Sequence, residues 1–351
     1  MPDQMVKAIE PVARKKGNSM RFPMHVTTDM VRWQVKNKIA GNKRYPVVLM
    51  LEPLYTCNLA CLGCTPERHT GDIRSRLTLD QCIEALEVSG APIVSICGGE
   101  PTVYPELVPL VEAAIERKRH IYLCTNGILL DRFFEKAKPH SRLSINVHLD
   151  GMRDTHDFVC DREGVFDKAI EMIKKGLSLG YQVCTNTTVF KETSTEEIEE
   201  MMQHLSSIGV HGMFISPGYH YEKLDTDHFM FKQEIHEKFT KILALSAQYP
   251  VFNTPLFLEF AAGRRDYPCT PWGNVTRTPL GWKGPCYLIG DQYFATWEEF
   301  WNTVDWDYWE KRQDERCQNC FMHSGFEPSV VRKLGESWSD VWTMAKWQFL
   351  S

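Results

Sequence analysis

Three closely spaced cysteines constrain the fold of this chain more than any other feature. Cys57, Cys61 and Cys64 have the spacing C-x3-C-x2-C and follow the apolar run at 47–54. A [4Fe-4S] cluster contains four irons and is usually held by four thiolates. A loop that supplies only three thiolates leaves one iron without a protein ligand. That open iron can bind a substrate.

The alternatives for this trio are a zinc site or ordinary buried thiols. Zinc sites usually pair two C-x2-C half-sites, or one such half-site with histidines. No such partner lies near the trio in the sequence. The spacing therefore favours an iron–sulfur loop, and a zinc-stabilised binding protein remains as the non-enzyme alternative.

The trio resembles the signature of the radical SAM superfamily, with Gly63 where an aromatic residue often precedes the last cysteine. The resemblance implies that the amino and carboxylate groups of S-adenosylmethionine (SAM) occupy the open iron. It also implies that reductive cleavage of the sulfonium yields a 5'-deoxyadenosyl radical. The expected cofactors are therefore a [4Fe-4S] cluster and SAM, with an electron donor such as flavodoxin or ferredoxin.

Composition narrows the class of protein and of partner. The net charge of -5 argues against nucleic acid, because phosphate binding requires an excess of Lys and Arg. No apolar run approaches the roughly 18 residues of a membrane span, and the N-terminus lacks a signal-peptide core. Twelve cysteines in a long chain of alternating strands and helices indicate reduced thiols rather than a disulfide framework. We expect a cytoplasmic protein, with peripheral contact at the inner face of the membrane if the substrate is a lipid.

Strand-like and helical segments alternate between residues 46 and 222. The strand-like runs are 47–54, 92–96, 120–123, 143–149, 182–189 and 213–216, and the helical segments are 79–90, 105–118, 130–138, 165–179 and 195–208. Six such runs joined by helices predict a parallel sheet with right-handed crossovers. The predicted fold is α/β, a partial TIM barrel of six β/α units with its chemistry at the carboxyl ends of the strands.

The segment before the barrel, residues 1–45, is predicted to be a polar arm and a helix. The arm carries Arg14-Lys15-Lys16, and the helix spans about 27–40. Arg32, Lys36 and Lys38 make this helix basic. Docking on the core and contact with a membrane surface are both open for it.

Residues 223–351 are predicted to form a C-terminal domain that covers the barrel. They contain every tryptophan of the chain except Trp33. Four cysteines in this domain have the spacing C-x16-C-x30-C-x2-C: Cys269, Cys286, Cys317 and Cys320. They could bind a second, fully ligated [4Fe-4S] cluster, a structural zinc ion, or no metal.

Residues at the strand ends supply the remaining candidates for cofactor binding. Gly98-Gly99-Glu100 ends strand two, and its glycines allow a ligand to approach the backbone, so this turn suits the ammonium group of SAM. The turn resembles the GGEP motif of radical SAM enzymes. Later strands carry further candidates for binding the adenosyl group of SAM: Asn146, His148, Asp150, Asn186 and Ser216. They lie toward the carboxyl ends of their strands, and the period-two alternation of a strand puts Asn146, His148 and Asp150 on one side. The alternative is a buried hydrogen-bond network without a ligand.

Longer runs resemble the adenosyl-hopene transferase family of hopanoid biosynthesis, from about residue 27 to about 328. They include Val94-Ser95-Ile96-Cys97-Gly98-Gly99-Glu100-Pro101, Val147-His148-Leu149-Asp150-Gly151, Ser216-Pro217-Gly218-Tyr219 and Cys269-Thr270-Pro271-Trp272-Gly273-Asn274. The resemblance implies addition of the adenosyl radical, through its C5', to the alkene of diploptene, which gives adenosylhopane. The substrate is then a bulky apolar polycyclic lipid, whose site must be largely hydrophobic. Residues 65–70 and Ser324 depart from the family pattern, so the lipid can differ.

The tertiary carbon radical left by this addition must be quenched, and a thiol is a good hydrogen-atom donor. Cys124, at the end of strand three, is the first candidate and Cys97 the second. A packed thiol is the alternative reading of Cys124. The alternative function is a radical SAM oxidase, or an enzyme that modifies a peptide or small molecule, which abstracts hydrogen and uses the tail cysteines for an auxiliary cluster.

Overall fold

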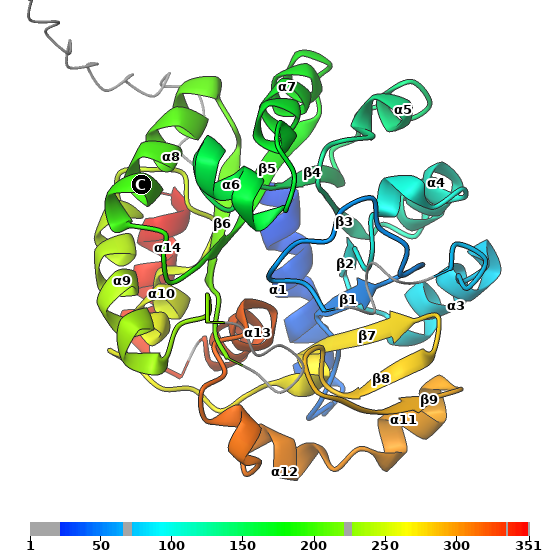
Figure 1. The fold of residues 1–351 in the computed structure, drawn as a ribbon. Coiled ribbons are helices and arrows are strands. Elements are labelled where there is room, and N and C mark those ends of the chain that lie inside the picture. The colour runs from blue at the N-terminus through cyan, green and yellow to red at the C-terminus, as the bar shows by residue number, and fades with distance from the viewer. Residues whose placement is uncertain (1–21, 66–71, 221–226, 335, 350–351) are drawn as a thin grey trace, which may run out of the picture.

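The computed structural model describes residues 22–65, 72–220, 227–334 and 336–349. The predicted arm at 1–20 and the predicted domain boundary at 222 lie outside this part of the chain. A single nine-stranded sheet has the order β6-β5-β4-β3-β2-β1-β7-β8-β9. Figure 1 shows this sheet curved around the centre of the molecule, with helices outside it.

Six parallel strands form the barrel and confirm the predicted partial TIM barrel. They are β1 (Val48–Leu51), β2 (Ile93–Ile96), β3 (His120–Thr125), β4 (Leu143–His148), β5 (Gln182–Val189) and β6 (Gly212–Pro217). The helices between them are α3 (Leu79–Ser89), α4 (Leu107–Glu116), α5 (Leu130–Phe134), α6 (Arg153–Val159), α7 (Val165–Ser178) and α8 (Thr195–Ile208). β1 is shorter than the predicted 47–54, and α6 was not predicted.

Side chains along β3 point alternately to the hydrophobic core under the helices and to the interior of the barrel. Ile121 and Leu123 are buried in the hydrophobic core beneath the helices. Tyr122 lies between them, and its ring meets that of Phe214 from β6 at 5.5 Å, edge to face. Because two strands separate β3 from β6, this contact crosses the interior. Cys124, two residues on, therefore faces the same interior.

The C-terminal part of the chain continues the sheet beyond β1. β7 (Asn274–Thr278) pairs with β1 in parallel, from Val48↔Asn274 to Leu51↔Arg277. β8 (Gly281–Pro285) and β9 (Gly290–Phe294) follow as antiparallel strands. The helices of this part are α9 (Lys232–Leu245), α10 (Pro255–Ala261), α11 (Trp297–Thr303), α12 (Trp306–Glu310), α13 (His323–Lys333) and α14 (Trp338–Phe349). The tail is thus hydrogen-bonded to the barrel through its backbone.

Helix α1 (Met24–Ile39) closes the amino-terminal end of the barrel. Its Asp29 carboxylate lies 3.0 Å from Nε2 of His120, the first residue of β3, and 2.9 Å from the Arg142 guanidinium. Trp33 Nε1 donates to the Pro46 carbonyl, just before β1, at 2.9 Å. Figure 1 shows α1 through the centre of the barrel. Across the part of the chain that the structure describes, no helix combines the length and the apolar character needed to cross a bilayer.

Candidate functional site

The cysteine loop after β1 is held in place by backbone hydrogen bonds. Leu62 N donates to the carbonyl of Val159, at the end of α6, at 2.9 Å. Cys64 N donates to the Cys61 carbonyl at 3.1 Å. Burial raises the pKa of Cys57 to about 12, and the negative charges of Glu100, Cys61 and Cys64 add to this effect. The three thiols thus lie close enough to repel one another when ionised.

The three cysteines of the loop do not form a group at the spacing of a single bound ion. Among the described residues, the one group of three metal-ligand atoms lying mutually within 4.8 Å is Cys61, His148 and Cys160. A tetrahedral zinc ion, with Zn–S distances of about 2.3 Å, holds its sulfurs about 3.8 Å apart. That Cys57, Cys61 and Cys64 hold a [4Fe-4S] cluster stays a prediction from their spacing in the sequence.

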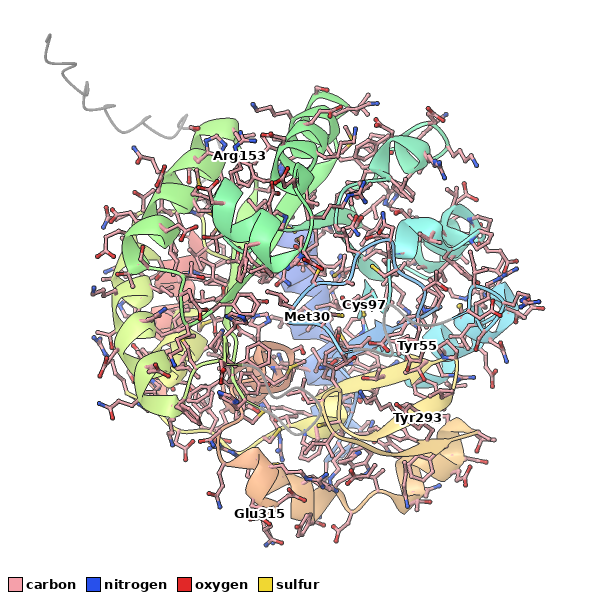
Figure 2. The ribbon with its side chains drawn as sticks, in the orientation of Figure 1. Met30, Tyr55, Cys97, Arg153, Tyr293 and Glu315 are labelled. Carbon is pink, nitrogen blue, oxygen red and sulfur yellow. The ribbon has the colours of Figure 1, made fainter. Side chains whose placement is uncertain are left out.

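The two glycines after β2 are required by the cysteine loop itself. A Cβ on Gly98, where φ is +101°, would lie 2.6 Å from the Leu54 carbonyl oxygen. A Cβ on Gly99 would lie 2.1 Å from the Thr56 carbonyl oxygen. The sequence explained these glycines by the close approach of a ligand. The structure offers a second explanation, because the turn packs on the backbone that leads to Cys57. Figure 2 shows Tyr55 and Cys97 near each other at this point.

Glu100 is a buried brace between strand ends. Its side chain accepts hydrogen bonds from Thr125 Oγ1 at 2.7 Å and from Asn126 N at 2.8 Å. Burial raises the pKa of this carboxyl group, while its hydrogen bonds act in the opposite direction. Asn126 Nδ2 in turn donates to Asn58 Oδ1 in the cysteine loop at 2.7 Å. This chain of contacts fixes the loop relative to β2 and β3.

His148 and Asp150 form an ion pair beside the cysteine loop. His148 Nε2 lies 2.5 Å from Asp150 Oδ2. Burial lowers the pKa of His148, but the Asp150 carboxylate outweighs burial and raises the pKa to about 9. Asp150 Oδ1 also accepts from Thr188 N at 2.6 Å. Asn186 pairs with His148 in the sheet register, and Ser216 pairs with Thr188. The structure thus gathers these candidates at adjacent strand ends, and their role in SAM binding stays a prediction.

Cys160 and His156 join this group, although the sequence did not single them out. Cys160 Sγ lies 3.6 Å from His156 Nε2. Its thiol also contacts Cys61, which raises the pKa of Cys160 together with burial. Both residues lie at the end of α6, the helix absent from the predicted elements, so no pattern in the sequence placed them near the cysteine loop.

Cys124 lies in the barrel interior within a small polar network. Ser95 Oγ lies 3.2 Å from its Sγ, and Asn146 Nδ2 donates to it at 3.6 Å. Cys184 donates to Asn146 Oδ1 at 3.5 Å, so the amide of Asn146 lies between two thiols. Burial raises the pKa of Cys124. At neutral pH Cys124 is therefore a thiol, the form that carries a transferable hydrogen atom.

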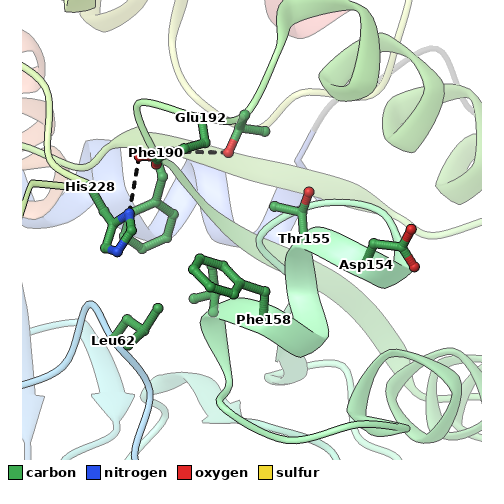
Figure 3. Close-up of a pocket in the computed structure, with 9 residues that line it drawn as sticks. Leu62, Asp154, Thr155, Phe158, Phe190, Glu192 and His228 are labelled. Atoms are coloured by element: carbon green, nitrogen blue, oxygen red, sulfur yellow. Dashed lines mark hydrogen bonds and ion pairs between the residues drawn. The ribbon is translucent and has the colours of Figure 1, made fainter.

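Gly63 is explained by Phe190, a buried residue just after β5. A Cβ on Gly63 would lie 2.8 Å from Phe190 Cζ and 3.8 Å from Phe229 Cε1. Phe190 and Phe229 are stacked with ring centroids 5.8 Å apart. The space beside the last cysteine is thus filled by an aromatic ring from another part of the chain. Leu62 and Phe190 also line a mostly apolar pocket of about 240 Å³, seen in Figure 3 with Phe158 and His228.

We expect Gly63→Ala to lower the iron content of the purified protein severalfold, because the new methyl group pushes the loop away from Phe190. Phe190→Leu in the same chain should restore part of the loss, since the two positions are in contact and their effects should not add. Iron and sulfide analysis measures both. Equal iron in Gly63→Ala and wild-type protein would show that the loop adapts without cost. Gly209→Ala is a control for adding a methyl group, since nothing lies near its Cβ position, though its positive φ adds strain.

The four tail cysteines converge on a second site. Cys269, Cys286, Cys317 and Cys320 line one pocket, which Tyr219 from the end of β6 also lines. Burial raises the pKa of Cys269, and the charges of the other three cysteines add to the effect. Tyr219 Oη lies 3.6 Å from Cys320 Sγ.

These tail sulfurs also form no group at single-ion spacing within the described residues. A second [4Fe-4S] cluster, a structural zinc ion and packed thiols stay the three alternatives for this site. Because Tyr219 follows β6 directly, the second site adjoins the carboxyl end of the barrel.

Comparison with family models divides the chain into two matched regions. Residues 51–205 match the radical SAM superfamily, and residues 213–344 match a domain of unknown function (DUF3463). The first region begins at the last residue of β1 and contains the cysteine loop and β2 to β5. The second contains β6, the tail strands and all four tail cysteines.

Individual relatives match part of the chain. Fe-coproporphyrin III synthase of Methanosarcina barkeri is 31% identical over 140 residues, 39% of this chain and 35% of that protein. GTP 3',8-cyclase of Clostridium botulinum is 23% identical over 249 residues, 66% of this chain and 77% of that protein. The chain thus spans about a third of the first relative's length. Among solved structures, Streptococcus suis SuiB bound to the precursor peptide SuiA has a TM-score of 0.58 at 14% identity, covering 94% of this chain and 82% of that one. That likeness concerns the fold.

Proposed function

We propose that this chain, whose residues 51–205 match the radical SAM superfamily, transfers the adenosyl group of SAM to the alkene of a hopene-like triterpene, converting diploptene to adenosylhopane. Enzymes of this superfamily use a [4Fe-4S] cluster and SAM. A cluster held by Cys57, Cys61 and Cys64 would supply the electron that cleaves the sulfonium of SAM and so delivers a carbon radical. Flavodoxin or ferredoxin is the proposed source of that electron.

The protein's own residues would hold SAM at the strand ends. We assign its ammonium group to the turn at Gly98, Gly99 and Glu100. We assign its ribose and adenine to the neighbourhood of His148 and Asp150. The ion pair of these two residues keeps the imidazole charged at neutral pH, with its N–H groups as donors. The amide and hydroxyl groups of Asn146, Asn186 and Ser216 complete the proposed set.

Aromatic residues deeper in the barrel support an apolar substrate. The Phe214 ring lies 5.5 Å from Tyr122 and 5.4 Å from Phe252. Phe252 lies just before α10, whose Leu256, Phe257 and Phe260 are also apolar. Phe214 also meets His323 from α13 at 5.5 Å, so the tail contributes to the same wall. A rigid polycyclic lipid needs such a lining, with few polar groups to orient it.

The single observation that carries the proposal is the half-buried thiol of Cys124 facing the barrel interior. Addition to an alkene leaves a carbon radical on the substrate, which must gain a hydrogen atom. Ser95 and Asn146 orient the Cys124 sulfur, and burial keeps it protonated. Hydrogen-atom abstraction from a substrate would not require such a donor.

Reconstitution tests the reaction directly. Protein with a rebuilt cluster, SAM, a low-potential reductant and diploptene should yield an adenosylated lipid, detected by mass spectrometry. Free 5'-deoxyadenosine with unchanged diploptene would contradict the proposal. Protein without reductant is the control, because the reductive cleavage of SAM then cannot occur.

The four-cysteine site favours a second candidate function, a radical SAM oxidase or an enzyme that modifies a peptide or small molecule. In that case the tail cluster would accept an electron from the substrate or bind it. The convergence of Cys269, Cys286, Cys317 and Cys320 supports this candidate. Oxidised product formed together with 5'-deoxyadenosine would favour it over adenosyl transfer.

A further inference from the structure

Two helices behind the barrel, α1 and α14, expose apolar side chains in regular stripes. On α1 the stripe is Met24, Val31, Val35 and Ile39, of which Ile39 is 83% exposed. On α14 it is Trp338, Trp342 and Phe349, with Trp338 89% exposed. Positions that differ by 4 or 7 residues share one helix face. Large apolar side chains repeated along exposed faces mark an interaction surface rather than scattered surface residues.

The charges on these helices have one sign at the surface. The other exposed residues within α1 are Arg32, Lys36 and Lys38, and those within α14 are Ser339 and Lys346. Each helix has one carboxylate, and both carboxylates are engaged. Asp29 pairs with His120 and Arg142, and Asp340 lies 2.9 Å from the Arg265 guanidinium. In a chain of net charge -5, this is a locally basic surface.

The end of α14 meets the start of α1. Gln348 of α14 is joined to Phe22, two residues before α1: its Nε2 donates to the Phe22 carbonyl at 2.8 Å, and its Oε1 accepts from Phe22 N at 3.2 Å. The rings of Phe22 and Trp347 also meet, with centroids 5.5 Å apart. Figure 1 shows both helices on the far side of the barrel.

We propose that α1 and α14 form a docking surface for the headgroup region of an anionic lipid bilayer. Tryptophan suits this region, since its ring is apolar and its N–H is polar. Lysine and arginine beside an apolar stripe can extend their charged ends to lipid phosphates while their stems stay among the acyl chains. A second copy of this chain is disfavoured because it would bring two basic helices together. The surface lies away from the cysteine loop, so this docking does not depend on the proposed reaction.

Vesicle sedimentation of the full-length protein tests the proposal. We expect binding to vesicles of equal parts phosphatidylglycerol and phosphatidylcholine, and binding at least about tenfold weaker to pure phosphatidylcholine. Arg32→Gln/Lys36→Gln/Lys38→Gln should weaken binding to the anionic vesicles by at least about tenfold. Trp338→Ser/Trp342→Ser should also weaken binding to the anionic vesicles by at least about tenfold. The binding that remains should depend on salt concentration more strongly in this variant than in the charge variant, because its basic residues are intact.

The matched charge control is Arg132→Gln/Lys136→Gln/Lys138→Gln, three exposed basic residues with the same spacing around α5. The matched apolar control is Phe231→Ser/Leu280→Ser, since both residues are 57% exposed on other elements. Both controls should bind vesicles as the wild type does, and circular dichroism shows whether every variant is folded. Wild-type protein that ignores the vesicles, or that binds both kinds equally, overturns the proposal. So does light scattering that shows a dimer which Trp338→Ser/Trp342→Ser dissociates, because the occupant is then a second copy. If the helix variants do not fold, loss of wild-type binding in high salt decides.

Discussion

Alanine at Cys57, Cys61 and Cys64 together is expected to abolish the cleavage of SAM. The reason is that no other described group in the barrel offers three thiols to hold the open cluster. The tail site is separate, so about four irons per chain should remain if it carries its own [4Fe-4S] cluster. Iron and sulfide analysis of anaerobically purified protein, together with chromatography for 5'-deoxyadenosine, measures both effects.

The reciprocal variant, with alanine at Cys269, Cys317 and Cys320, is the matched control. It should also lose about four irons per chain, but it keeps the loop that holds the first cluster. If the variant with alanine at Cys57, Cys61 and Cys64 contains no iron, the tail cysteines bind no cluster. That result would weaken the second candidate function. Unchanged SAM cleavage in the first variant would contradict the whole account of the site.

Cys124→Ala is expected to lower the yield of adenosylated lipid by about a hundredfold, equivalent to about 3 kcal/mol in the barrier of the quenching step. SAM cleavage should continue, because the hydrogen-bond partners of the Cys124 sulfur include Ser95 and Asn146 and the residue is not one of the proposed cluster ligands. In D2O the wild-type product should carry one deuterium, since a thiol exchanges its hydrogen with solvent. Mass spectrometry of the lipid measures the yield and the label together.

Cys82→Ala is the control for removing a buried thiol. Cys82 is a wholly buried residue of α3, beside Tyr104, and lies outside the barrel interior. Its replacement should leave the yield and the label unchanged. A labelled product at the wild-type yield from Cys124→Ala would move the donor role to Cys97 or to solvent.

The barrel could be predicted from the sequence because the strand and the helix of each unit have recognisable local patterns. The predicted strand at 182–189 and the predicted helix at 195–208 match β5 and α8 residue for residue. Short-range signals explain this success: Ser194 caps the start of α8, and Gly209, with φ 92°, ends it. The cysteine spacing likewise predicts a cluster-binding loop locally, since all three proposed ligands come from one short stretch.

What the sequence could not reveal depends on contacts between distant segments. β7 lies more than 200 positions after β1, and its short run carries polar residues, so nothing local marks it as a strand beside β1. Phe190 fills the space beside Gly63 from the end of another strand. Cys160 reaches Cys61 through α6, a short helix without a side-chain cap. In each case the contact is set by tertiary packing between distant segments, which the hydrophobic periodicity of a short stretch does not indicate.

The pairing of β1 with β7 limits how the tail can be removed or exchanged. The strand that leads into the cysteine loop is flanked on one side by residues 274–278. Removing the tail would strip β1 of that neighbour and leave a row of main-chain amides open to intermolecular pairing. A foreign tail grafted onto this barrel would therefore have to bring a strand in the same register. The barrel and the tail thus share one sheet and depend on each other for their structure.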